Sequence, residues 1–273
     1  DHRDLHSFPT RRSSDLSIAI QAIVRKDSWD MINNLNITQT KEAIEKLEKI
    51  NKELNSFKSI LSEEKYYSLN MCLETLNRKD WRKQMINIDD DSYDFFTGQS
   101  SQNTDIKKIK NIFGAFGLSR RRLFNGVESD FDELIKVSDL SYPEYCKTDI
   151  LYSNKLSELL MPVFDKARFK CEYNRCLNEF LLLQLALHAY KLEHKSYPAK
   201  LGDLAPNYIK TIPTDPFTKN DQYKYTITSN TYLLYSIGPD FKDNGGRAVI
   251  QQNSNSRFVS YEDKGDIVAG YNR

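Results

Sequence analysis

One apolar stripe constrains the fold of this chain more than any other feature. Between residues 169 and 190, apolar and aromatic side chains recur alternately every three and four positions, as Phe169, Tyr173, Cys176, Phe180, Leu183, Leu187 and Tyr190. This spacing is that of one face of an α-helix, sustained for about 30 Å. A stripe of this length is typical of a helix buried in a core. The sequence predicts helix from about residue 153 to residue 194, which Pro162 either starts or kinks.

The composition changes after this helix. Tyr197-Pro198 ends it, and a short helical turn is expected around residues 201–208. The prolines of the connection that follows hold it extended; they are Pro206, Pro213 and Pro216. Residues 222–228 and 232–236 are rich in aromatic and β-branched side chains, which predicts two strands joined by a turn at Ser229-Asn230. Further short strands are expected at residues 247–250, 258–261 and 267–269.

The first half of the chain has helical patterning. Apolar residues of the segment 17–81 recur at helical spacing, as Ile44, Leu47, Leu54, Phe57 and Leu61. A second helix is expected to begin at Glu63-Glu64, after Ser62, and to run to Trp81. Phe131–Val137 is predicted to be a short helix, and Tyr142-Pro143 to begin a turn. The fold class is therefore α+β, an N-terminal all-α region followed by a long helix packed on a small antiparallel sheet.

Residues 1–16 match the translation of a common sequencing adapter, so we expect them not to be native and expect real protein from about Ser17. The native segment then divides into a helical domain at 17–152 and an α+β module at 153–273. On this interpretation, a leader or membrane anchor that preceded Ser17 would be missing from the chain.

Charge and hydropathy exclude several classes of function. The chain carries 39 basic and 38 acidic residues, a net charge of +1, which is no electrostatic footprint for nucleic acid. Hydrophobic residues make up 39% and charged residues 28%, as in a globular protein. No apolar run reaches the length of a bilayer-spanning helix, so membrane contact is expected only through a missing N-terminal anchor.

The strongest candidate site lies in residues 235–246, which read Tyr-Ser-Ile-Gly-Pro-Asp-Phe-Lys-Asp-Asn-Gly-Gly. Asp240 and Asp243 flank one turn, and Asp266 returns from a later strand after its own glycine. Three carboxylates brought together would repel one another without a cation, and Ca²⁺ accepts such oxygen-rich shells. No Asp-x-Asp-x-Asp-Gly loop is present, so this is not an EF-hand. The alternative is an ordinary Asp-Asn-Gly turn whose carboxylates face solvent.

The order of these features resembles the globular half of the major pseudopilin of type II secretion systems. The similarity covers residues 165–273 and is carried by Tyr197-Pro198, Leu201-x-x-Leu204, Pro213-x-Asp215-Pro216, Tyr223-x-Tyr225, Tyr235-Ser236-x-Gly238-x-Asp240-x-x-Asp243 and Gly265-Asp266-Ile267. In that family the C-terminal loop binds one calcium ion that orders the module. The resemblance therefore implies Asp240, Asp243 and Asp266 as calcium ligands, with backbone carbonyls near Ile237 and Arg247 as additions.

The chain departs from a pseudopilin in the helix that precedes Tyr190. In the family this helix begins as an apolar membrane span, whereas here it carries charged residues at Asp165, Lys166, Arg168, Lys170, Glu172 and Arg175. Six charges in this segment would be too costly in hydrocarbon. The segment cannot be a pseudopilin anchor. The chain resembles a larger envelope protein in which a helical domain precedes a pseudopilin-like module.

Several other residues carry weaker signals. The four cysteines, Cys72, Cys146, Cys171 and Cys176, have no zinc or redox spacing. They are expected to be buried thiols, with a Cys72–Cys146 disulfide as the alternative. His188 and His194 are expected on opposite helix faces, which disfavours a shared metal. Arg120-Arg121-Arg122 is interpreted as an exposed helix end rather than a phosphate or headgroup site, and Asp89-Asp90-Asp91 as a solvated loop.

Three functions follow from these features. The leading expectation is a non-enzymatic bacterial envelope protein, membrane-anchored at full length, with a calcium-stabilised module and protein partners. It would serve a structural or interaction role related to type II secretion or pilus-like systems. One alternative is a metal-assisted hydrolase that uses the tail aspartates. The sequence has no Gly-x-Ser-x-Gly, His-Glu-x-x-His or Walker motif, which disfavours it. The other is a true pseudopilin subunit whose anchor lies before Ser17.

Overall fold

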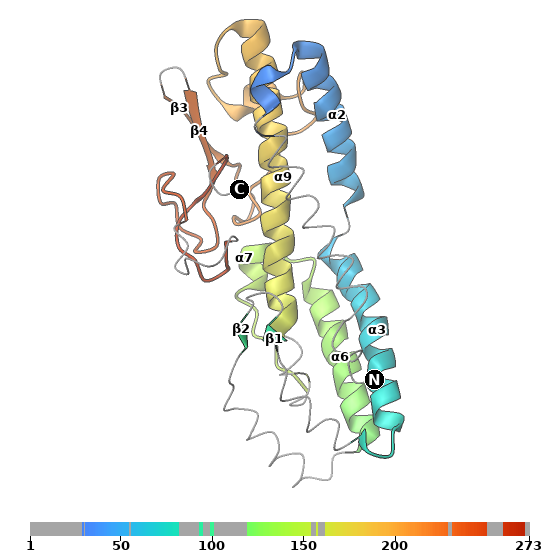
Figure 1. Cartoon of the computed structure of the whole chain (residues 1–273). Helices are drawn as coiled ribbons and strands as arrows, with labels where there is room; N and C mark the ends of the chain where they lie inside the picture. Colours follow the sequence, from blue (N-terminus) through green and yellow to red (C-terminus); the bar gives the residue numbers. More distant parts are fainter. Residues whose placement is uncertain are drawn as a thin grey trace. The chain divides into compact units, whose positions relative to one another are not determined.

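The computed structural model describes residues 29, 31–54, 56–81, 93–94, 99–100, 119–153, 157, 162–228, 231–249 and 259–270. The chain forms two compact units (Figure 1). The first consists of residues 1–56, 140–148 and 165–273, and the second of residues 57–139 and 149–164. The division into domains at 17–152 and 153–273, made from the sequence, remains a prediction. No helix in the described ranges is both long and apolar enough to cross a bilayer.

The first unit is built around α9 (Pro162–His194), 33 residues long, of which residues 165–194 belong to this unit. Pro162 is the first residue of α9 in the described part of the chain, a position at which proline is favoured. The predicted stripe is confirmed as core, because Cys176, Phe180, Leu183 and Leu187 are at most 1% exposed. The predicted residues 154–156 and 158–161 lie outside the described part of the chain.

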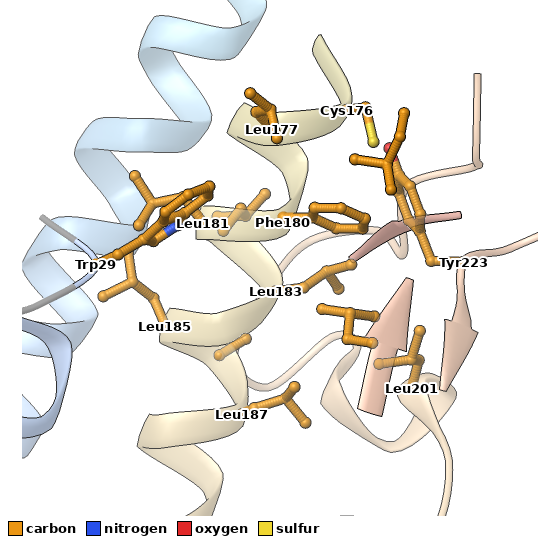
Figure 2. Close-up of a cluster of buried hydrophobic side chains, with 14 of the residues drawn as sticks. Trp29, Cys176, Leu177, Phe180, Leu181, Leu183, Leu185, Leu187, Leu201 and Tyr223 are labelled. Atoms are coloured by element: carbon orange, nitrogen blue, oxygen red, sulfur yellow. The ribbon is translucent and has the colours of Figure 1, made fainter. Parts of the chain in front are cut away.

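A second face of α9 is also buried, which the sequence analysis did not predict. Figure 2 shows Leu181 and Leu185 on the side of Trp29, and Phe180, Leu183 and Leu187 on the opposite side, toward Tyr223 and Leu201. A helix covered on two faces is apolar on both, so its amphipathicity is weak. The single apolar stripe therefore predicted one buried face of the helix, whereas two faces are buried.

The remaining helices of this unit are shorter. They are η2 (Ile32–Asn34), α2 (Ile37–Glu53), α7 (Tyr142–Tyr145) and the 3₁₀ turn η3 (Leu201–Leu204). A capping box begins α2, in which Asn36 Oδ1 accepts from Gln39 N–H at 2.9 Å and Gln39 Oε1 accepts from Asn36 N–H at 3.1 Å. The turn expected at Tyr142-Pro143 is the short helix α7, because the proline is tolerated in a first helical turn.

The sheet of the first unit has three antiparallel strands in the order β3-β4-β5. They are β3 (Lys224–Thr228), β4 (Thr231–Ser236) and β5 (Ile267–Val268). The register pairs Lys224 with Tyr235 and Ser236 with Ile267. The expected strand at 247–250 is reduced to a bridge between Ala248 and Asp266, and residues 259–261 form no strand. Residues 229–230, 250 and 258 lie outside the described residues.

The sheet packs on α9 through aromatic side chains. The ring of Tyr223 faces that of Phe180 (Figure 2), with the two centroids 4.9 Å apart. Leu234 and Ile267 belong to the same buried cluster. The α+β fold class is thus confirmed, with a long helix against a small antiparallel sheet.

The second unit is a helix pair, α3 (Phe57–Asn77) and α6 (Arg120–Val137), with the two-residue strands β1 (Tyr93–Asp94) and β2 (Gln99–Ser100). Both helices contribute buried apolar residues; these include Leu61, Leu76, Leu123, Val127, Phe131 and Leu134. An ion pair between Lys65 and Asp132 joins the two helices, and another joins Lys58 of α3 to Asp139, just after α6.

Two predicted helix boundaries are wrong. The break expected at Ser62 lies earlier, since α2 ends at Glu53 and α3 begins at Phe57, so Leu61 and Glu64 belong to the same helix, α3. Phe57 and Leu61 continue the apolar spacing of α2, and this continuity hid the break. The helix expected at Phe131–Val137 begins at Arg120, where the Ser119 side chain accepts from Arg122 N–H at 3.3 Å. The interpretation of Arg120 as a helix end is confirmed.

Candidate functional site

The bend at residues 238–246 follows β4 and starts from a fixed point in the core. Asp215 is 2% exposed, and its Oδ1 accepts from the Ser236 hydroxyl at 2.7 Å while its Oδ2 accepts from Ile237 N–H at 3.1 Å. Its Oδ1 also accepts from Phe217 N–H at 3.0 Å. The buried carboxylate therefore ties the loop after Pro213 to the end of β4, and it sets the direction in which the bend leaves the sheet.

Gly238 allows the chain to turn at this point. Its φ of +72° lies in the left-handed region, and a Cβ built on it would lie 2.4 Å from the carbonyl oxygen of Gly265. Only glycine satisfies both conditions. The close approach brings the segment that carries Asp266 against the start of the bend.

Asp240 is half-buried and accepts hydrogen bonds from both segments. Its Oδ1 accepts from Lys242 N–H at 3.1 Å, and its Oδ2 accepts from Gly265 N–H at 3.2 Å. The side-chain amide of Asn244 donates to Oδ2 at 3.2 Å. Asp240 thus links the bend to the residue that precedes Asp266.

Asp243 is exposed on the outer side of the bend. Its Oδ1 accepts from Gly245 N–H and from the Tyr235 hydroxyl, both at 3.0 Å. The Nζ of Lys224 lies 3.5 Å from its Oδ2. The Gly245 N–H, followed by Tyr235 and Lys224, lowers the pKa of the Asp243 carboxyl below its ordinary value.

Asp266 is the buried member of the group. It is fully buried, and its two oxygens accept from Asn244 N–H at 3.1 Å and Gly246 N–H at 2.7 Å. Burial raises the pKa of this carboxyl, with smaller increases from Asp243 and Asp240, while the two N–H donors oppose the rise. The residues that surround Asp266 therefore leave its negative charge only partly compensated.

The structure brings the three predicted residues to one bend. Asn244 contacts two of them, since its backbone N–H reaches Asp266 and its side chain reaches Asp240. Within the described part of the chain, the cation paired with this group is Lys224. The described residues hold no group of three or more His, Cys, Asp or Glu side chains arranged to hold a metal ion. The carboxylates are neighbours, but they do not point at a common centre.

Of the two backbone carbonyls that the resemblance implied, that of Arg247 already accepts a backbone hydrogen bond. The carbonyl of Arg247 accepts from Asp266 N–H at 2.8 Å, as part of the bridge between Ala248 and Asp266. It therefore helps to position Asp266 in this structure. The donor set available to a cation consists of the carboxylates of Asp240, Asp243 and Asp266. This hard oxygen set fits Ca²⁺ by chemistry.

Sequence reasoning missed a buried polar group on α9, separate from the acidic bend. Glu179 is 9% exposed; it accepts from the Tyr223 hydroxyl at 2.6 Å and from Arg175 Nε at 2.9 Å. Cys176 is fully buried beside this group, and burial raises the pKa of its thiol. The spacing Arg175-x-x-x-Glu179 was a usable signal for an ion pair along a helix. Nothing in the local sequence indicates that Tyr223 joins it.

The weaker candidates have structural explanations. Cys72, Cys146, Cys171 and Cys176 are free thiols, so no Cys72–Cys146 disulfide is present; Cys146 is exposed, Cys171 half-buried, and the other two buried. His188 Nε2 lies 3.0 Å from the Leu35 carbonyl, and the His194 ring packs against Tyr190 with centroids 4.2 Å apart. The Asp89-Asp90-Asp91 run lies outside the described residues.

Comparison of the chain with protein-family models, with curated proteins and with solved structures gives no match.

Proposed function

We propose that residues 165–273 form a calcium-stabilised module with a structural or interaction role in a bacterial envelope protein. The observation that carries this proposal is the meeting of Asp240, Asp243 and Asp266 at one bend, with one of the three fully buried. Asp266 lies beside two other carboxylates, and both raise its pKa. A divalent cation would offset this repulsion.

Asp240, Asp243 and Asp266 would hold the ion, and the ion would supply the positive charge that the group lacks. The three residues belong to two segments, 238–246 and 265–266, which already share hydrogen bonds through Asn244 and Gly265. A bound cation would strengthen the same connection. Its role would be to hold the bend against the end of the sheet.

The envelope location and the link to type II secretion or pilus-like systems rest on the resemblance of residues 165–273 to the major pseudopilin. Extracytoplasmic calcium near millimolar concentration is sufficient for a weak site of three carboxylates. The proposed partners are other envelope proteins.

Thermal unfolding tests the calcium site. A cation that binds only the folded state raises the free energy of unfolding by about 2.7 kcal/mol when its concentration is a hundred times its Kd. We expect millimolar Ca²⁺ to raise the melting temperature relative to excess chelator, and Mg²⁺ to raise it less. Hydrogen exchange should locate the added protection in residues 238–246 and 265–268 and leave α3 and α6 unchanged.

Variants distinguish this site from a general salt effect. Asp240→Ala, Asp243→Ala and the double variant should lower the stability of the tail module and lose the calcium-dependent rise. Glu262→Ala is the matched control, because Glu262 is an exposed acid of the same region and lies outside the group. A calcium-dependent rise of equal size in the double variant would show that these carboxylates are not the ligands. Absence of any rise in the parent protein would refute the calcium site.

A further inference from the structure

A half-open surface cavity of about 340 Å³ lies between η2 and the end of α9, remote in sequence from the acidic bend. It is lined by Asn33, His188, Lys191, Leu192 and Lys195. Its volume lies at the lower end of the range for small-molecule sites, roughly 300–1,000 Å³. Among the lining residues that belong to the described part of the chain, three are basic and none is acidic. Such a lining attracts an anion.

The basic residues converge because of helical spacing. Lys191 follows His188 by three positions, so these two side chains lie on one face of the last turns of α9. Lys195 is the first residue after the helix and lines the same cavity. Asn33 arrives from η2, more than 150 residues earlier in the chain. The contact between His188 Nε2 and the Leu35 carbonyl, at 3.0 Å, holds that segment against the helix. A carbonyl only accepts, so Nε2 carries the proton of this hydrogen bond.

Lys191 is already oriented by its neighbours. Its Nζ lies 4.5 Å from the centroid of the Tyr197 ring and 3.3 Å from the Tyr197 hydroxyl. An ammonium group has three N–H donors, so one bond to the hydroxyl leaves two for a ligand. Tyr197 therefore reduces the freedom of Lys191 without using all its donors.

Lys195 occupies a backbone conformation that glycine usually takes. Its φ is +62°, and its N–H donates to the Lys191 carbonyl at 2.8 Å in the turn that ends α9. Helices commonly end on a left-handed residue, and glycine is preferred there because it has no Cβ. A lysine at this position costs about 1 kcal/mol in backbone strain. The strained lysine places a further ammonium group at the cavity.

Two negative groups of the described residues close to the cavity, the Glu193 carboxylate and the Leu192 carbonyl, have partners of their own. Glu193, on the same turn of α9, pairs with Lys41 Nζ at 2.7 Å and accepts from the Tyr208 hydroxyl. The Leu192 carbonyl at the helix end accepts from Lys195 Nζ at 3.1 Å. These contacts reduce the negative potential that a helix C-terminus would otherwise present to an anion.

We propose that this cavity binds a small molecule through a phosphate or carboxylate group, held by Lys191 and Lys195 with Asn33 as an additional polar contact. Leu192 supplies the apolar surface against which the rest of such a molecule would pack. The site does not depend on the calcium proposal.

Titration of the full chain with inorganic phosphate and, separately, with succinate tests the site at constant ionic strength. Calorimetry gives the affinity, and chemical-shift changes at residues 188–195 give the location. A charge-assisted hydrogen bond contributes about a tenfold change in affinity. We therefore expect Lys191→Met and Lys195→Gly each to weaken binding by about that factor. Tighter binding of phosphate than of succinate would identify the phosphate source, and the reverse order the carboxylate source.

Lys195→Gly separates loss of the ligand from loss of the fold. Glycine relieves the positive φ, so this variant should unfold at the same or a higher temperature while its affinity falls. Lys52→Met, at an exposed lysine of α2, is the control for net charge and should bind as the parent does. Unchanged affinity in the Lys191→Met/Lys195→Gly double variant would overturn the proposal, as would the absence of shifts at residues 188–195 in the parent.

Discussion

The Tyr223 hydroxyl donates a 2.6 Å hydrogen bond to Oε2 of Glu179, and so joins the residue before β3 to the middle of α9. Arg175 Nε donates to the other oxygen at 2.9 Å. Burial raises the pKa of Glu179, whereas Arg175 and Tyr223 oppose the rise. Two donors thus allow a carboxylate to lie in the interface between helix and sheet.

Tyr223→Phe should destabilise the protein by about 2 kcal/mol, because it removes one of two donors to a buried carboxylate without changing the packed ring. Chemical denaturation at neutral pH measures the loss. Tyr66→Phe is the control, since Tyr66 is 73% exposed, and it should change the stability little. A loss in Tyr66→Phe as large as in Tyr223→Phe would contradict the assignment.

The loss of stability caused by Tyr223→Phe should depend on pH. A carboxyl whose folded-state pKa is raised stabilises the fold fully below its unfolded pKa, and this stability is lost as the pH rises through the folded pKa. Tyr223 limits that loss by stabilising the ionised Glu179. The free energy of unfolding of the variant should therefore be furthest below that of the parent protein at neutral pH. The difference between the two free energies should become smaller in acid. A constant difference across the pH range would mean that Glu179 is not the group involved.

Asp215→Asn should destabilise the first unit by about 2–3 kcal/mol. The amide group of asparagine would oppose one of the buried N–H or O–H donors, and a buried unpaired donor is costly. Ser236→Ala removes the 2.7 Å bond to Oδ1 and the hydroxyl that accepts from Gly238 N–H at 3.2 Å, and it should cost less, about 1–2 kcal/mol. The double variant should lose less than the sum of the two, because both changes affect one contact. Strict additivity in denaturation experiments would argue against this coupling.

Gly238→Ala and Gly245→Ala form a matched pair. Both glycines have positive φ, +72° and +70°, but a Cβ at Gly238 would meet the Gly265 carbonyl at 2.4 Å, whereas a Cβ at Gly245 meets nothing within 4 Å. Gly245→Ala should cost about 1 kcal/mol, from backbone strain alone. Gly238→Ala should cost roughly 3 kcal/mol, because a backbone atom must also move. Equal melting temperatures would show that the two segments do not approach this closely.

The calcium effect should weaken in acid. Burial raises the pKa of Asp266, so its protonated form stabilises the ion-free fold, and this stability is lost as the pH rises through the folded pKa. Calcium requires the ionised carboxylate and therefore displaces the proton. The rise in melting temperature on adding Ca²⁺ should be larger near pH 7 than near pH 4.5, close to the ordinary carboxyl range of about pH 4. An equal rise at both values would exclude Asp266 as a ligand.

Local patterns in the sequence were sufficient for the regular elements of the first unit. The stripe from Phe169 to Tyr190 predicted α9, and aromatic and β-branched content predicted β3 and β4 to within about two residues at each end. These signals depend on neighbours three, four or two positions apart, so they survive without tertiary information. The break between α2 and α3 was misplaced because apolar spacing continues across it.

Local sequence likewise predicted only part of the candidate site. The turn around Asp240 and Asp243 could be predicted from Gly238 and the Asn-Gly-Gly run, because these residues act on their immediate neighbours. The approach of Asp266 was inferred through the resemblance, and its burial was not predicted. The role of Asp215 as a core acceptor depends on Ser236, twenty-one residues later.

By itself, the sequence determined where this chain is helical, where it turns, and which acids could gather near residue 240. The tertiary structure decided that α9 is buried on two faces, that Glu179 meets Tyr223, and that His188 contacts Leu35 beside a basic surface cavity. The physical reason is the distance along the chain over which each kind of interaction acts. Helix and turn preferences arise within a few residues, whereas burial and hydrogen-bond partners depend on which distant segments pack together to exclude water.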